Sequence, residues 1–268
     1  MFCSKINLLN GCDDEPRGIQ TAPLRLSLKW YDEVTSTNEV AKELMGDEVE
    51  EGTVVIAKQQ TAGRGRYANE WFSPEGGLYF TVALRPRITV RHIPLLAIAV
   101  ALAIADSIEL SMLSTTQIKW PNDIYVSGKK VGGVLIDTSI SGEKINYALA
   151  GIGVNVSRGG EEVSPLVRKR AIWLSDLVGC APQPTELLTA ILGSFTTWYQ
   201  RLQVMDLNAI IDAFNRRSLL MGREIQAQTK DGIVSGKCTG ISEQGALLLR
   251  NSNGDVLEVM EGTICSWS

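Results

Sequence analysis

The stretch from Gln59 to Gly77, QQTAGRGRYANEWFSPEGG, places two arginines between glycines. Gly63 and Gly65 allow unusual backbone angles and the close approach of a ligand, and their amides can hydrogen-bond an anion. If the segment is extended, Arg64 and Arg66 point in alternate directions, so one can reach a phosphate while the other braces the loop. Taken without the other motifs, this stretch is explained equally well by a basic turn exposed to solvent.

A dinucleotide-binding turn has to be tested, because Gly63, Gly65 and Ala68 fit G-x-G-x-x-[GA] after a candidate strand. The residues that follow, NEWFSPEGG, cannot form the helix that this fold requires, since they end in a proline and two glycines. The region about twenty residues downstream, TVALRPR, carries no carboxylate for a ribose. The pattern therefore indicates a different kind of loop.

The motif KWPND, from Lys119 to Asp123, favours a binding site over a simple turn. Pro121 stiffens a turn after a strand and presents Asn122 and Asp123 at the strand end. Seven residues after Asp123 comes Lys130, ahead of two glycines that leave space for a ligand beside it. An Asx turn and a lysine at a hairpin tip are the plain structural alternatives.

Together these stretches predict a pocket that holds the cations of Arg64, Arg66 and Lys130 and the carboxylate of Asp123. A third glycine stretch, GIGVN, borders this pocket, and Trp71 supplies a lid or a stacking surface. Such a pocket suits a polyanion such as ATP. The sequence has no GxxxxGK[ST] phosphate loop, so ATP would be bound in another way.

The composition is that of a folded, acidic protein. The chain has 268 residues, of which 44% are hydrophobic and 21% charged, with a net charge of −4 and a pI of about 5.3. This charge argues against a nucleic-acid binder driven by general basicity. Five scattered cysteines without a CxxC pair indicate reduced thiols and a cytoplasmic location. His92 is the sole histidine, which excludes multi-histidine metal sites, and we predict it at the surface or at a helix start.

The elements that must position these residues alternate between strands and helices. We predict strands at residues 53–59, 77–86, 117–120, 131–137 and 147–156. We predict helices after a loop within 32–45, over 94–113 and 185–203, and in a stretch that ends near 218. The apolar run at 93–105 is too short to span a bilayer, so we expect a buried helix and no membrane partner.

Changes in composition and in the pattern of predicted elements divide the chain into three parts. Residues 1–24 are polar and irregular, which predicts a flexible tail. Residues 25–218 form the main domain. Residues 219–268 contain short strands separated by KDG, SEQG and NSNGD, which predict a small closed β-barrel.

Four stretches resemble, in order and spacing, the motifs of biotin protein ligases, also called biotin–[acetyl-CoA-carboxylase] ligases. They are STN at 36–38, QQTAGRGR followed by WFSP, KWPNDIYVSGKKVGG, and GIGVN. The resemblance covers about residue 28 to the C-terminus. It implies an α+β fold with a mixed sheet flanked by helices, in the class II synthetase-like biotin/lipoate ligase arrangement. It also implies an SH3-like barrel at the C-terminus.

The resemblance implies a reaction in two steps. The carboxylate of biotin attacks the α-phosphate of ATP, giving biotinyl-5′-AMP and pyrophosphate. A lysine of a biotin carboxyl carrier domain then attacks the mixed anhydride and releases AMP. Mg²⁺ is expected with ATP, and the resemblance assigns it no ligands in this chain.

Roles for individual residues also follow from the resemblance. Lys130 would bridge the biotin carboxylate and the α-phosphate, Arg66 would lie on the loop that covers the ligands, and Asp123 would orient or deprotonate the acceptor lysine. The biotin-binding residues would be Ser36, Thr37, Asn38, Gln60, Gly63, Arg64, Gly65, Arg66, Lys130 and Gly133. The ATP-binding and adenylate-binding residues would be Arg64, Arg66, Trp71, Asn122, Lys130 and Asn155.

Three alternatives remain open from the sequence. A lipoate or octanoate ligase or transferase would share the catalytic fold, although GRGR and the terminal barrel favour biotin. A non-catalytic sensor could hold biotinyl-AMP and regulate a partner. A homodimer and a monomer are both compatible with the family. Only about 27 residues precede the region of resemblance, too few for a DNA-binding domain, so we expect no DNA partner.

Overall fold

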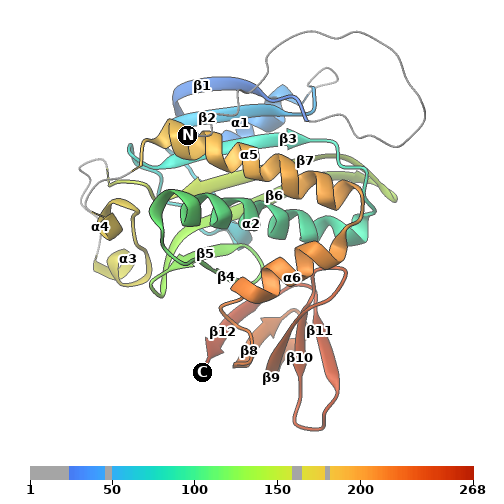
Figure 1. Cartoon of the computed structure of the whole chain (residues 1–268). Helices are drawn as coiled ribbons and strands as arrows, with labels where there is room; N and C mark the ends of the chain where they lie inside the picture. Colours follow the sequence, from blue (N-terminus) through green and yellow to red (C-terminus); the bar gives the residue numbers. More distant parts are fainter. Residues whose placement is uncertain (1–23, 46–49, 159–164, 179–181) are drawn as a thin grey trace.

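The described part of the chain forms a large mixed sheet with helices on both faces and a smaller antiparallel sheet beside it (Figure 1). The structure is a computed structural model that describes residues 24–45, 50–158, 165–178 and 182–268. The tail predicted at residues 1–24 therefore lies outside the described residues, apart from Leu24.

Seven strands build the large sheet in the order β1-β2-β3-β7-β6-β5-β4. They are β1 (Ser27–Val34), β2 (Thr53–Gln60), β3 (Leu78–Leu84), β4 (Gln117–Lys119), β5 (Asp123–Val126), β6 (Lys129–Ser141) and β7 (Lys144–Val154). β1 and β2 are parallel, and all other neighbours are antiparallel. The sheet is therefore mixed, which confirms the predicted fold class.

Helices cover the two faces of this sheet unequally. The helices are α1 (Thr37–Leu44), α2 (Ile93–Met112), α3 (Pro165–Arg170), α4 (Ser175–Val178), α5 (Pro184–Gln203) and α6 (Leu207–Arg217), with short 3₁₀ turns at Arg66–Ala68 and Val90–His92. α2 and α5 lie across one face (Figure 1). On the opposite face, Ala41 of α1 packs against Val55, Ala83 and Leu149. Alternate residues of each central strand thus feed two separate cores.

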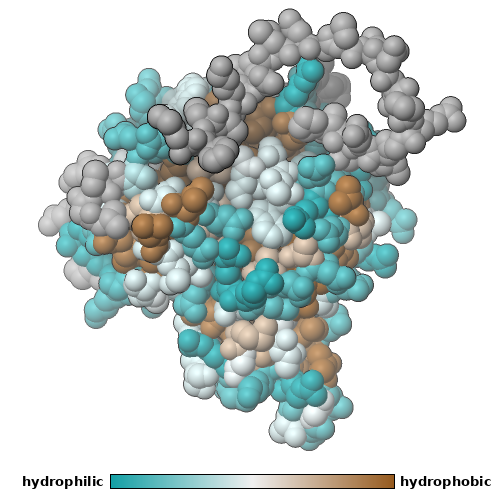
Figure 2. Space-filling model, in the orientation of Figure 1, coloured by the Kyte–Doolittle hydropathy of each residue, from teal (hydrophilic) through white to brown (hydrophobic). Residues whose placement is uncertain are grey.

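α2 is the central helix of the larger core. The segment Val90–Met112 is long and apolar enough to cross a membrane, yet 67% of its most apolar window is buried inside the fold. A helix that is apolar on every side is typical of the core of a large domain. The outward side of the helical layer is mostly hydrophilic, with hydrophobic residues in small separate patches (Figure 2). His92 lies directly before α2 as predicted, but it is buried and its Nδ1 lies 2.7 Å from Thr89 Oγ1.

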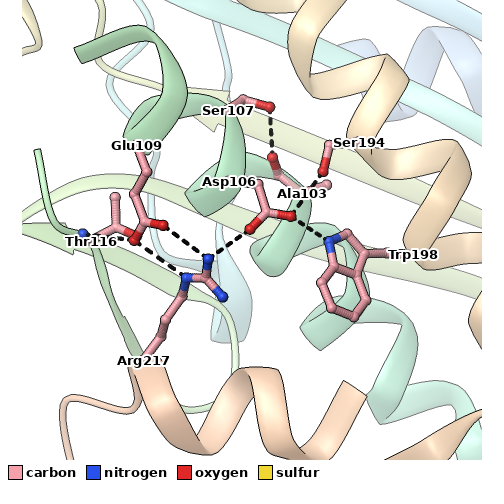
Figure 3. A network of polar contacts seen from close by, with 8 residues as sticks. All are labelled: Ala103, Asp106, Ser107, Glu109, Thr116, Ser194, Trp198 and Arg217. Atoms are coloured by element: carbon pink, nitrogen blue, oxygen red, sulfur yellow. Dashed lines mark hydrogen bonds and ion pairs between the residues drawn. The ribbon is translucent and has the colours of Figure 1, made fainter. Parts of the chain in front are cut away.

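A polar network joins the three long helices (Figure 3). Arg217 of α6 donates hydrogen bonds to Asp106 Oδ1 at 2.8 Å and to Glu109 Oε2 at 2.9 Å, both on α2. Trp198 and Ser194 of α5 donate to Asp106 Oδ2 at 2.7 and 3.1 Å. These contacts fix α2, and with it the sheet beneath, relative to α6.

The last part of the chain forms a five-stranded antiparallel sheet in the order β11-β10-β9-β8-β12. Its strands are β8 (Glu224–Thr229), β9 (Gly232–Ile241), β10 (Leu247–Arg250), β11 (Val256–Val259) and β12 (Thr263–Trp267). All five occur where short strands are predicted, and the sheet fits the expected SH3-like domain. It is joined to the large domain by Trp120, whose indole Nε1 donates to the carbonyl of Gly245 at 2.9 Å in a buried contact.

Two strands and two helices escaped prediction. β1 is mostly exposed, so it shows no apolar alternation, and we expected a loop from Asp32. β5 has only four residues between two turn signals. The short helices α3 and α4 carry no extended periodicity. Each of these elements is too short or too exposed for its pattern to be read locally.

Candidate active site

A cavity of about 210 Å³ lies where the large sheet meets the GRGR loop and β12. The predicted residues on its wall are Ser36, Thr37, Asn38, Gln60, Arg64, Gly65, Arg66, Trp71, Asn122, Asp123, Lys130 and Gly133. These residues come from segments far apart in the sequence. The structure therefore brings together most of the residues that the motifs singled out.

One end of the cavity is a rigid polar pocket at the start of α1. Gln60 Oε1 accepts hydrogen bonds from the backbone N of Thr37 at 2.8 Å and from its Oγ1 at 3.2 Å. Gln60 Nε2 donates to Ser73 Oγ at 2.9 Å. Asn38 accepts from Thr81 at 2.6 Å and donates to Asp137 at 2.9 Å. Because every group has a partner, donors and acceptors are held in fixed directions for a neutral polar ligand.

A glycine on β7 makes room for this pocket. A Cβ at Gly151 would lie 2.1 Å from Asn38 Oδ1, so any side chain there would displace the amide. The first glycine of the stretch GIGVN is thus required because the side chain of Asn38 packs directly against its backbone.

The GRGR loop folds back on itself and over the cavity. Trp71 N donates to Gly63 O at 2.9 Å, and Gly65 N donates to Asn69 O at 2.7 Å. Arg64 pairs with Glu39 at 2.6 Å and with Asp137 at 3.2 Å. Arg64 therefore braces the loop against α1 and β6.

Arg66 is held in a different way from Arg64. Its guanidinium lies 4.8 Å from the ring centroid of Tyr67 and donates to Tyr67 Oη at 2.9 Å. Tyr67 Oη in turn donates to the carbonyl of Gly262 at 3.4 Å, next to β12. Among the described residues Arg66 forms no ion pair with a carboxylate, so its charge is available to an anionic ligand.

Lys130 lines the cavity next to Asp123 and Trp71. Its Nζ lies 2.6 Å from Asp123 Oδ1 and 4.9 Å from the ring centroid of Trp71. A bulge in the pairing of β5 with β6 sets Lys130 opposite Tyr125. Asn122, beside Asp123, donates its side-chain amide to the carbonyl of Val134 and is 8% exposed. The KWPND turn is thereby fastened to the strand that carries Lys130.

Glycines on β6 and β7 form the floor beneath Trp71. A Cβ at Gly153 would lie 2.5 Å from Trp71 Nε1, and one at Gly133 would lie 3.3 Å from Lys130 Nζ. Trp71 Nε1 is buried and has no hydrogen-bond partner in the structure. The indole therefore packs closely against bare backbone, next to the lysine.

Two predicted site residues are not brought to the wall of this cavity. Asn155 donates its side-chain amide to Ile172 O at 3.2 Å, and its backbone N donates to Val131 O at 2.8 Å. Gly63 packs beneath the loop, where a Cβ would meet Trp71 O at 2.4 Å. Both residues shape the surrounding backbone in this structure.

The wall also includes residues that sequence reasoning missed. Lys119, Tyr67 and the segment 262–264 line the cavity, and the last of these belongs to the small domain. Burial lowers the pKa of the Lys119 ammonium, Asp123 acts in the opposite direction, and the charge of Lys130 lowers it further. Lys119 opens the KWPND motif, so its position was a usable signal. Residues 262–264 carry no motif and become visible only in the fold.

Family comparisons agree with this architecture. Residues 30–155 match the model described as the biotin/lipoate A/B protein ligase family. Residues 220–265 match the model described as the biotin protein ligase C terminal domain. The two matches correspond to the large sheet and to the five-stranded sheet.

Individual relatives cover most of the chain. It is 32% identical over 238 residues to the bifunctional ligase/repressor BirA of Bacillus subtilis (strain 168), which covers 88% of this chain and 73% of that protein. It is 33% identical over 205 residues to the biotin–[acetyl-CoA-carboxylase] ligase of Paracoccus denitrificans, which covers 75% of this chain and 85% of that protein. Its structure is similar to a biotin protein ligase from Aquifex aeolicus in complex with biotin and ATP. That similarity has a TM-score of 0.77 at 30% identity and covers 90% of this chain and 98% of that chain.

Proposed function

The chain belongs to the biotin/lipoate A/B protein ligase family, and we propose from this premise that it is an ATP-dependent biotin protein ligase. In the first step a carboxylate oxygen of biotin attacks the α-phosphorus of ATP. The bond between the α-phosphorus and the bridging oxygen breaks, and pyrophosphate leaves with that electron pair. In the second step the amine of a carrier lysine attacks the biotinyl carbonyl, and AMP leaves. We assign both steps to residues 25–218 and treat 219–268 as a second domain.

The placement of Lys130 is the observation that carries this proposal. Its ammonium shares a cavity with Gln60 and lies 4.9 Å from the ring centroid of Trp71 and 2.6 Å from Asp123 Oδ1. Two anions, a carboxylate and a polyphosphate, repel each other in the first step, so a cation at their junction lowers the barrier. Lys130 stabilises the charge that develops on the phosphoryl oxygens.

The polar pocket suits the neutral end of biotin. Thr37 and Gln60 offer fixed hydrogen-bonding groups to a cyclic urea, which needs both donors and acceptors. Trp71, lying over the glycine floor, supplies a flat surface for the adenine. Arg66 on the loop covers the adenylate and helps to keep water from the reactive anhydride.

Asp123 serves the second step. In the structure its carboxylate is paired with Lys130. When Lys130 binds carboxylate and phosphate oxygens, Asp123 becomes available to accept a proton from the acceptor lysine, which must be neutral to attack.

Mg²⁺ fits this site as a companion of ATP. Within the described ranges no three His, Cys, Asp or Glu side chains cluster to hold a metal ion. The wall offers the carboxylates of Asp123 and Glu70. This donor set suits an ion that is held mainly by phosphate oxygens and water, as Mg²⁺ is in many ATP sites. Bound in that way, the ion would neutralise phosphate charge.

The acceptor we propose is a lysine of a biotin carboxyl carrier domain in the cytoplasm, with neither DNA nor membrane as a partner. The acidic pI of about 5.3 and the burial of α2 support this. Both sides of the cavity come from one chain, so a homodimer is not needed to complete it. Light scattering on the purified protein determines whether it is a monomer or a dimer.

One assay tests the function. The protein is incubated with Mg-ATP, a carrier domain and either biotin or lipoate, and the carrier is weighed by mass spectrometry. We expect one biotinyl group on the carrier and none from lipoate. Attachment of lipoate alone would identify a lipoate ligase. Pyrophosphate release without any carrier modification would identify a sensor that holds biotinyl-AMP.

A further inference from the structure

Lys119 is a cavity cation that the proposed mechanism does not use. It ends β4, the edge strand of the large sheet, and its backbone pairs with Asp123 across β4 and β5. Its side chain is half-buried and lies on the cavity wall with Lys130 and Asp123. It is therefore close to the reacting groups, on the side of the cavity opposite to β2.

Trp267 of the small domain holds the Lys119 side chain. Lys119 Nζ lies 4.3 Å from the ring centroid of Trp267, which is the geometry of a cation–π contact. Trp267 pairs with Ile225 on β8, so the backbone that carries the ring is fixed by the five-stranded sheet. The same strand, β12, supplies Thr263 and Ile264 to the cavity wall. Docking of the small domain thus sets the position of this ammonium.

Lys119, like Arg66, is a cavity cation without a carboxylate partner among the described residues. Arg64 is paired with Glu39 and Asp137, and Lys130 is paired with Asp123. Among the described residues, Lys119 has no carboxylate oxygen within ion-pair distance. A half-buried ammonium that faces an aromatic ring keeps its N–H donors for a ligand, and it gains most from an ion with several charges.

Strand order gives the direction in which that ligand runs. The polar pocket lies at the end of β2, Lys130 is on β6, and Lys119 is on β4 at the far edge of the same sheet. A biotin carboxylate that leaves the pocket meets Lys130 with the α-phosphate. A polyphosphate that runs from Lys130 toward the β4 edge would approach Lys119.

We propose that Lys119 binds the β- and γ-phosphates of ATP and stabilises the departing pyrophosphate, and that Trp267 positions Lys119 for this task. The α–β phosphoanhydride bond breaks with its electron pair on the bridging oxygen, so negative charge grows on the pyrophosphate beside this ammonium. The small domain thereby completes the nucleotide site. This inference rests on the proposed ligase function.

Separating the two half-reactions tests the inference. The full-length wild type, Lys119→Met and Trp267→Leu are assayed for pyrophosphate release against ATP concentration. They are also assayed for transfer from added biotinyl-5′-AMP to a carrier domain. Biotinyl-5′-AMP contains no β- or γ-phosphate, so only the first assay involves the groups that Lys119 contacts. Lys237→Met, an exposed lysine on β9, is the matched control.

We expect Lys119→Met to lower kcat/KM for ATP about 100-fold, the effect of removing one stabilising donor, and to leave transfer from biotinyl-5′-AMP within about 2-fold. Trp267→Leu should lower kcat/KM for ATP in the same direction, and Trp267→Phe, which keeps a ring beneath the ammonium, should recover most of it. Lys237→Met should behave as wild type.

The opposite results are equally clear. An unchanged ATP dependence in Lys119→Met, or equal losses in both half-reactions, overturns the phosphate role and leaves a structural contact. An effect of Lys119→Met without one of Trp267→Leu overturns the positioning role. Failure of the wild type to transfer biotin from biotinyl-5′-AMP overturns the proposed ligase function itself.

Discussion

The pair of Lys130 and Asp123 joins the two half-reactions at the scale of single residues. A 2.6 Å contact between an ammonium and a carboxylate satisfies both groups while no ligand is bound. Binding of two anionic substrates gives Lys130 new partners and leaves Asp123 to serve the amine. One ion pair thus supplies an electrostatic group for adenylation and a proton acceptor for transfer.

Replacement of Lys130 by alanine should abolish adenylate formation and preserve the fold. We expect the rate of biotin-dependent pyrophosphate release to fall by about 10³-fold, because the junction between the two anions loses its central cation. The measurement is pyrophosphate release, with circular dichroism to check folding. Lys129→Ala is the control, since Lys129 is exposed and its ammonium donates to the carbonyl of Arg168 at 3.3 Å. Pyrophosphate release near the wild-type rate in Lys130→Ala would remove the lysine from the mechanism.

At the scale of elements, the network around Arg217 fixes the helical layer behind the site (Figure 3). Burial raises the pKa of Glu109, but hydrogen bonds from Arg217 and Thr116 outweigh it, so the net pKa lies below its usual value. A carboxyl whose pKa is lowered by folding stabilises the protein above its unfolded pKa. That contribution is lost as the pH falls through the lower, folded pKa.

Glu109→Gln should therefore lower the free energy of unfolding at neutral pH and change it little at acidic pH. We expect the free energy of unfolding to drop by about 1–2 kcal/mol at pH 7, since a charged hydrogen bond to a partly buried partner is lost. The difference from wild type should shrink as the pH falls below about 4. Urea unfolding at both pH values measures it. Glu43→Gln, at an exposed position on α1, should show neither effect, and a difference that is independent of pH would contradict the assignment.

At the scale of the whole molecule, the two sheets form one site. Trp120 is 3% exposed, lines the cavity and donates to Gly245 O in the small domain at 2.9 Å. Leu219 N also donates to Ile118 O at 2.9 Å, next to the junction between the domains. The small domain is therefore held beside the cavity by contacts that Trp120 and Ile118 make.

Trp120→Phe should weaken both stability and ATP use. We expect the free energy of unfolding to fall by about 1–3 kcal/mol, because the carbonyl of Gly245 stays buried without its donor. We also expect a higher KM for ATP, since the small domain loses a contact that positions it at the cavity. Trp198→Phe is the matched control, because its indole also donates a hydrogen bond, at 2.7 Å to Asp106, but lies away from the cavity. Equal changes in KM for the two variants would show that general destabilisation is the cause.

Local sequence patterns predict much of this architecture. β2, β3 and β7 are continuous apolar runs, and α2 is apolar on every side, so their types follow from burial alone. The five strands of the small domain are separated by turn residues that end each strand. GRGR and KWPND also identified part of the cavity wall, because glycines and charged residues at fixed spacing reflect what a polyanion requires.

The sequence by itself determined the long buried strands, the long helices and the motifs that carry chemistry, since backbone preferences and side-chain charge act over a few residues. The tertiary structure alone decided that β12 reaches the cavity, that Lys119 stacks on Trp267, and that Asn155 bonds to Ile172 instead of lining the wall. The first two outcomes depend on which sheet edges and faces meet across more than a hundred residues of chain, and the third depends on how the chain returns to Asn155 17 residues later. No local pattern encodes that meeting, because it is set by the packing of the whole core.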